Sequence, residues 1–120
     1  MLCDREIVVA GREKLMIRNQ WAIKVANQLG KREKLEQVAE ESAELCKAAL
    51  KVIRAEGLSD NPTPTELQEA SQNFYEEFRD VLIAMRVLVS PSKYASLLDV
   101  DNSPKFKRWY KRLEESKENG

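Results

Sequence analysis

The sequence predicts an all-α fold, a helical bundle of four to five helices, from three observations. The chain of 120 residues contains only four glycines and four prolines, so few positions would interrupt a helix. Charged residues make up 33% of the chain and hydrophobic residues 42%, a composition typical of amphipathic helices. Between the clusters of helix-breaking residues, apolar side chains recur at spacings of three and four residues. We expect one domain over residues 1–120, with residues 1–12 and 115–120 peripheral or frayed.

Two helices are expected before the central loop of the chain. The first ends at Leu29, and Gly11 allows a separate short helix or turn before it. The second runs from about Lys31 to Ala55, where apolar residues follow one face, and Gly57 stops it.

The third helix has a start signal in its sequence. In Thr63-Pro64-Thr65-Glu66, Thr63 is the expected N-cap, Pro64 the first helical residue and Glu66 the third. The apolar pattern then continues to about Val89. The second and third helices are thus the two long central helices, and we expect them to be antiparallel.

The last segments of the chain are shorter. Ser90-Pro91 ends the third helix and begins a short turn through Leu98. A final amphipathic helix begins at Ser103-Pro104 and frays after about Glu115. It places four apolar side chains on one face: Phe106, Trp109, Tyr110 and Leu113.

Both central helices carry a pair of carboxylates where a core residue is expected. Glu41 interrupts the apolar row of the second helix, and Glu44 follows three residues later. Glu77 and Asp80 repeat this arrangement in the third helix. Carboxylates that face each other in an apolar environment are costly unless cations lie between them. Because hard divalent cations prefer oxygen ligands, the pattern predicts a Mg²⁺ or Mn²⁺ site.

The composition excludes several other classes of function. The chain has no histidine, which removes Ser-His-Asp and Cys-His catalysis and histidine-containing metal sites. Twenty basic and twenty acidic residues give a net charge of zero, so no overall field attracts nucleic acid or membrane. No apolar run approaches the roughly 18 residues of a membrane span. Cys3 and Cys46 form no recognisable pair and are expected to be free thiols in the cytoplasm.

The order of these motifs resembles a known enzyme family. Glu40-Glu41-Ser42-Ala43-Glu44 and Glu77-Phe78-Arg79-Asp80 resemble the EExxE and ExxD motifs of the MazG-like, all-α nucleoside triphosphate pyrophosphohydrolases. Lys105-Phe106-Lys107-Arg108 is similar to the basic K-F-x-R stretch of that family. The chain departs from the family in the 32 residues between Glu44 and Glu77, a longer gap than in compact members. It also has Trp109-Tyr110 where those proteins tend to have Arg-Phe.

The resemblance implies Mg²⁺-dependent hydrolysis of a nucleoside triphosphate to the monophosphate and pyrophosphate by a metal-activated water, with Mn²⁺ as a possible substitute. It also implies a homodimer or homotetramer, in a role such as nucleotide-pool housekeeping. The implied metal ligands are Glu41, Glu44, Glu77 and Asp80, and the implied catalytic residues are Glu40 and Glu41. The candidate phosphate-binding residues are Lys47, Lys105, Arg108, Lys111 and Arg112, and the candidate base-binding residues are Trp21 and Asn19.

Four alternatives stay open at this point. The glutamates could be solvated and paired with Lys47 or Arg79, and Trp21 could belong to the core. The chain could be a non-catalytic interaction module that binds a partner protein through its C-terminal aromatic and basic helix. It could also bind nucleic acid through its basic tail, although the zero net charge argues against this.

Overall fold

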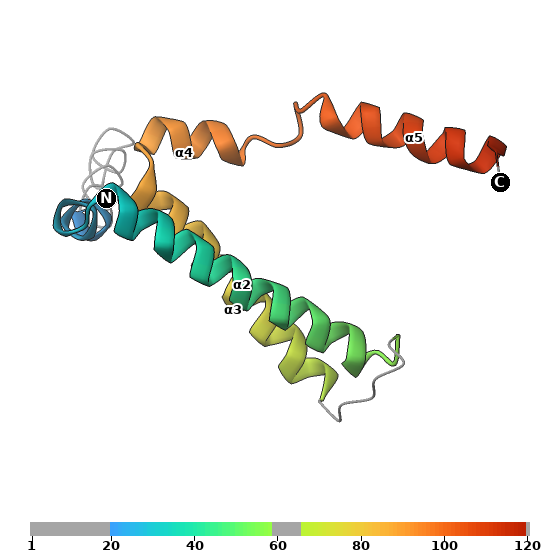
Figure 1. The fold of residues 1–120 in the computed structure, drawn as a ribbon, viewed down its shortest axis with the longest axis horizontal. Helices are drawn as coiled ribbons and strands as arrows, with labels where there is room; N and C mark the ends of the chain where they lie inside the picture. Colours follow the sequence, from blue (N-terminus) through green and yellow to red (C-terminus); the bar gives the residue numbers. More distant parts are fainter. Residues whose placement is uncertain (1–19, 59–65, 120) are drawn as a thin grey trace, which may run out of the picture. The chain divides into compact units, whose positions relative to one another are not determined.

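A computed structural model describes residues 20–58 and 66–119 of the chain. These residues form helices and turns without a strand among them, which confirms the all-α fold. Residues 20–28 are helical, and four further helices follow along the chain (Figure 1). They are α2 (Lys31–Ala55), α3 (Leu67–Leu88), α4 (Pro91–Leu98) and α5 (Lys105–Asn119). The chain divides into two compact units, Met1–Ser90 and Pro91–Gly120.

The ends of α2 are fixed by two glycines and lie where the sequence predicts them. At the start, the backbone N–H of Gly30 donates a hydrogen bond of 3.2 Å to Glu33 Oε2. At the end, Gly57 adopts the left-handed conformation with φ of 73°. The N–H of Gly57 then donates to the carbonyl of Arg54, and the N–H of Leu58 donates to that of Ile53. These two bonds form a Schellman motif, which satisfies carbonyls that the helix would leave unpaired.

Helix α3 begins later than the sequence signal predicts. Thr63 and Pro64 lie outside the described residues. Glu66, expected at the third helical position, instead has an extended backbone and is the N-cap, so that prediction is wrong. Its carbonyl accepts the N–H of Ala70 at 3.0 Å, and Ala70 is the first buried residue of the helix. Helix α3 therefore begins one turn before Ala70, where it first packs against its neighbour. Tertiary packing of this kind contributes more to the stability of a helix than its local start signal does.

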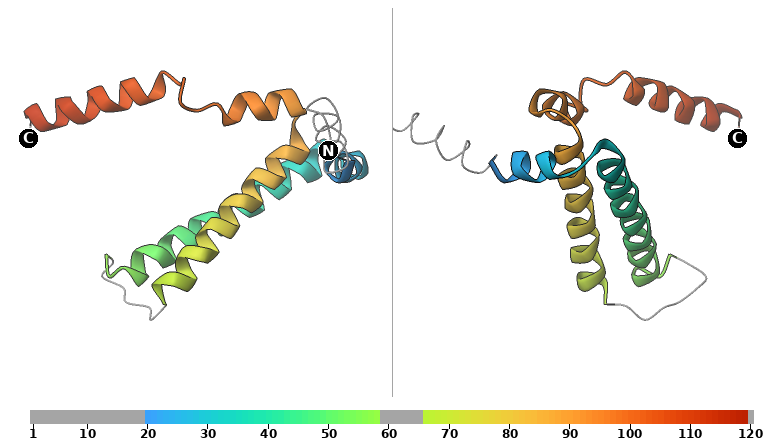
Figure 2. Two further views of the ribbon diagram at one scale, coloured as in Figure 1. Left: turned by 180° about the vertical axis from the view of Figure 1, so that it is seen from behind. Right: turned by 60° about the vertical axis from the view of Figure 1, so that its left-hand side comes forward.

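Helices α2 and α3 lie side by side and run in opposite directions, as the views of Figures 1 and 2 agree. Their contact is built on three buried alanines, Ala48, Ala70 and Ala84. Larger apolar side chains of the predicted rows, including Val38, Leu45, Phe74 and Val81, are half-buried around these alanines. Small residues at the contact let the helices approach closely, which brings the carboxylates of the two rows toward each other.

The second unit consists of α4 and α5. Helix α4 begins at Pro91 and ends at Leu98, as expected for the segment after α3. Before α5, the hydroxyl of Ser103 accepts the backbone N–H of Lys105 at 3.2 Å. Helix α5 continues to Asn119, and the expectation that it frays after about Glu115 stays a prediction. Its last turns are rich in good helix formers, and Lys117 pairs with Glu114 at 3.5 Å. Among the described helices, none is long and apolar enough to span a membrane.

Candidate metal centre

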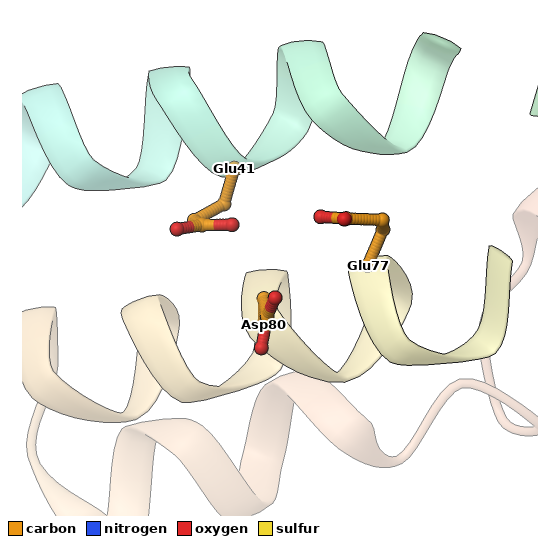
Figure 3. Close-up of side chains that lie close together, drawn as sticks. All are labelled: Glu41, Glu77 and Asp80. Carbon is orange, nitrogen blue, oxygen red and sulfur yellow. The ribbon is translucent and has the colours of Figure 1, made fainter. Parts of the chain in front are cut away.

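Three carboxylates from the two central helices meet between those helices. Glu41 extends from α2 toward α3, while Glu77 and Asp80 extend from successive turns of α3 (Figure 3). Each contributes one oxygen, and these three oxygens lie within 4.8 Å of one another. All three residues are half-buried. Glu41 and Glu77, which interrupt the two apolar rows, therefore lie together with Asp80. We call these three residues the carboxylate cluster.

Within the described part of the chain, no lysine or arginine forms an ion pair with any of the three members of the carboxylate cluster. Partial burial and then the neighbouring charges of Asp80, Glu44, Glu41 and Glu76 raise the pKa of Glu77 above its ordinary value. The cluster thus concentrates negative charge in a partly desolvated position.

The amide of Gln37 supports the cluster from α2. Its Nε2 donates a hydrogen bond of 2.7 Å to Glu41 Oε1. Gln37 is not among the site residues predicted from the sequence motifs. The signal was present, since Gln37 precedes Glu41 by four residues and lies on the same helix face.

Three of the predicted site residues on α2 lie outside the carboxylate cluster. Glu44 is exposed and forms an ion pair with Lys47, with Nζ 3.8 Å from Oε1. This is the alternative pairing considered for the glutamates, although Glu44 is still close enough to raise the pKa of Glu77. Lys47 itself is exposed, as is Glu40.

The carboxylate cluster fits a hard divalent cation. Its three members supply only oxygen ligands, from two helices, and they lie close together with no ion pair to any described lysine or arginine. Mg²⁺ is bound in proteins by few carboxylates and completes its shell with water or substrate phosphates. Mn²⁺ accepts the same ligands. Glu41, Glu77 and Asp80 are the residues that would hold such an ion, with Glu44 the nearest further carboxylate from the sequence motif.

A pocket of about 340 Å³ adjoins the cluster and shares two of its members, Glu41 and Asp80. Its other polar residues are Lys34 and Gln37, both on α2. The rest of the lining is apolar and comes from the segment before α2 and from α3: Val25, Leu29, Ile83, Ala84 and Val87. Mostly apolar walls with a few polar groups are typical of small-molecule sites. We call this the α2–α3 pocket.

The remaining predicted phosphate ligands lie together in the second unit. Lys105, Arg108, Lys111 and Arg112 line one open pocket of about 470 Å³ along α5, with Glu115 at its edge. The spacing of three and four residues places them on one face of the helix. Their role toward phosphates stays a prediction.

The two predicted base-binding residues are only partly described. Asn19 lies outside the described residues. Trp21 is 62% exposed, so the alternative that it belongs to the core is wrong. The ammonium of Lys24 lies 4.8 Å from the centre of its ring in a cation–π contact.

Comparison with known proteins adds no relative to this description. A scan against protein-family models matched none of them, and searches of curated proteins and of solved structures also returned no match. The resemblance to the MazG-like pyrophosphohydrolases therefore depends on the ordered acidic and basic motifs alone. Of these motifs, the structure brings Glu41, Glu77 and Asp80 together into one cluster.

Proposed function

We propose that this chain is a Mg²⁺-dependent nucleoside triphosphate pyrophosphohydrolase. The observation that carries the proposal is the carboxylate cluster, in which Glu41, Glu77 and Asp80 converge from two helices and form no ion pair with a described basic residue. A divalent cation would relieve this repulsion, and divalent cations bind the phosphates of nucleotides. Mn²⁺ is the expected substitute.

The reaction consumes one water and one nucleoside triphosphate. The water oxygen forms a new P–O bond, one P–O bond of the α,β-anhydride breaks, and its electron pair leaves with the departing phosphate oxygen. The products are the nucleoside monophosphate and pyrophosphate. A bound divalent ion would lower the pKa of the attacking water and orient the phosphates.

The residues of the chain have separate roles in this proposal. Glu41, Glu77 and Asp80 hold the cation, with Glu44 completing the ligand set of the sequence motif. Glu41 and Glu40 are the candidates to take the proton from water, and Glu41 is favoured because it belongs to the cluster while Glu40 is exposed. The amide of Gln37 fixes the Glu41 carboxylate through its 2.7 Å hydrogen bond. From the sequence motif alone, the basic residues of α5 are the candidates to neutralise phosphate charge.

The proposal is tested by incubating the full chain with a panel of ribo- and deoxyribonucleoside triphosphates, with and without Mg²⁺, and measuring pyrophosphate. We expect metal-dependent release. The variants Glu41→Gln and Asp80→Asn should lower kcat by at least about 100-fold, because each removes a charged ligand. Both should retain the helical circular dichroism signal.

The matched control is Glu36→Gln on the same helix. Glu36 is exposed, pairs with Arg32 at 2.9 Å and lies outside the cluster, so kcat should stay within about twofold of the wild type. A wild type that releases pyrophosphate from no nucleotide would disprove the proposal. So would a Glu41→Gln variant that keeps full activity.

A second candidate function is a non-catalytic interaction module. It is favoured by the exposed apolar face of α5, where Phe106, Trp109, Tyr110 and Leu113 are 50–63% exposed. Trp109→Ala would abolish partner binding in such a module. The nucleotide panel separates the two functions, because an interaction module would release no pyrophosphate with any metal.

A further inference from the structure

The amide of Gln37 restricts how the Glu41 carboxylate can bind a cation. Its Nε2 lies 2.7 Å from Glu41 Oε1, and the amide must be the donor in this contact, since an ionised carboxylate only accepts. Hydrogen bonds to an ionised acceptor are shorter and stronger than those between neutral groups. One of the two Glu41 oxygens is therefore engaged before a cation binds.

The other oxygen of Glu41 is left for the carboxylate cluster. Figure 3 shows the two oxygens turned in opposite directions, one of them toward Glu77. Gln37 lines the α2–α3 pocket together with Asp80 and Ala84, which follow Glu77 in α3. Because α2 and α3 run in opposite directions, Gln37 and Glu77 then lie on opposite sides of Glu41. The hydrogen bond from Gln37 thus leaves a single Glu41 oxygen toward the other carboxylates.

The number of oxygens that a carboxylate offers affects which divalent cation it binds. Ca²⁺ takes roughly six to eight oxygens in a flexible arrangement and often uses both oxygens of one carboxylate. Mg²⁺ needs a near-octahedral arrangement and usually keeps several waters. One oxygen from each of Glu41, Glu77 and Asp80 lies within 4.8 Å of the other two. Three single oxygens leave places for the waters of Mg²⁺ but supply at most half of the oxygens that Ca²⁺ takes.

From this hydrogen bond, and resting on the proposed function, we infer that Gln37 is a positioning residue that makes the carboxylate cluster prefer Mg²⁺ to Ca²⁺. By engaging Glu41 Oε1, its amide prevents Glu41 from binding a cation with both oxygens. Replacing a residue that orients a metal ligand typically changes metal affinity by about 10–100-fold. A hydrogen bond that only stabilised α2, as pairs four residues apart can do, would not alter the relative affinity for two ions.

The test measures metal binding to the full chain without nucleotide. Mn²⁺ is the probe, because the electron paramagnetic resonance of free Mn²⁺ shows how much is bound, and Mg²⁺ or Ca²⁺ is added to displace it. The wild type should lose half of its Mn²⁺ at a Mg²⁺ concentration at least about fivefold below the Ca²⁺ concentration required. Gln37→Met keeps the side-chain length and removes the donor, so this ratio should fall below about twofold. Gln37→Arg restores a donor to Glu41 and should recover the ratio, because its charge weakens the binding of both divalent ions alike.

The control is Gln68→Met, the same substitution at an exposed residue of α3 outside the carboxylate cluster. It should leave the ratio unchanged. Three results would overturn the inference: a wild type without preference between the two ions, a Gln37→Met variant that keeps the wild-type ratio, or a Gln37→Arg variant that does not recover it. If pyrophosphate release still requires Mg²⁺ in those cases, the proposed function stands alone. If the wild type neither binds a divalent cation nor releases pyrophosphate, both fail.

Discussion

At the scale of single residues, Glu77 is the carboxylate on which repulsion concentrates. Partial burial, followed by the charges of Asp80, Glu44, Glu41 and Glu76, raises its pKa in the folded state. A folded protein with a raised carboxyl pKa binds the proton more tightly than the unfolded chain does. The resulting stability is fully present below the ordinary glutamate pKa. It is lost as the pH rises through the raised value.

Glu77→Gln should therefore stabilise the metal-free chain at neutral pH, because a neutral amide replaces the repelled carboxylate. The free energy of unfolding, measured by urea denaturation with a chelator, should differ between variant and wild type by an amount that grows with pH across this window. Added Mg²⁺ should stabilise the wild type and have less effect on the variant. Glu69→Gln on the exposed start of α3 is the control. A difference that does not change with pH would contradict the assignment of repulsion to Glu77.

At the scale of elements, the end of α2 depends on the backbone of Gly57. Its φ of 73° lies in the left-handed region, and a Cβ added there would meet no atom within 4 Å. Gly57→Ala should therefore destabilise the chain through backbone strain alone, by about 1–2 kcal/mol in denaturant unfolding. Gly57→Asn should lose less, since asparagine tolerates this conformation. Equal losses for both variants would show that the conformation is not the cause.

Some features of the helices and of the site could be predicted from the sequence, and others could not. The bounds of α2 could be predicted because Gly30 and Gly57 act through the local backbone. The start of α3 could not, because it follows the packing of Ala70 rather than the Thr63-Pro64 signal. Glu41 and Glu77 could be identified because each interrupts an apolar row, and Asp80 because it follows Glu77 by three residues on the same side of the helix. The α2–α3 pocket could not be predicted, because its lining comes from three segments of the chain.

At the scale of the whole molecule, the described residues bury little apolar surface. In the described part of the chain, only Ala48, Ala70 and Ala84 are buried. Large apolar residues of α2 and α3 are exposed, among them Leu50 at 50% and Tyr75 at 69%. Burying one such side chain stabilises a protein by about 1.5–3 kcal/mol, so these faces favour association with further protein surface.

We therefore expect the chain to form a homodimer or homotetramer, as the family resemblance also implies. Light scattering after size-exclusion chromatography should then measure a mass of two or four times 13.8 kDa. Leu50→Lys places a charge on the exposed face of α2 and should raise the dissociation constant at least about tenfold. Leu58→Lys, at a residue 71% exposed after the end of α2, adds the same charge away from the helix faces and should leave the mass unchanged. A wild type that is monomeric at micromolar concentration would contradict this prediction. The exposed side chains of α2 and α3 would then be solvated in the working protein.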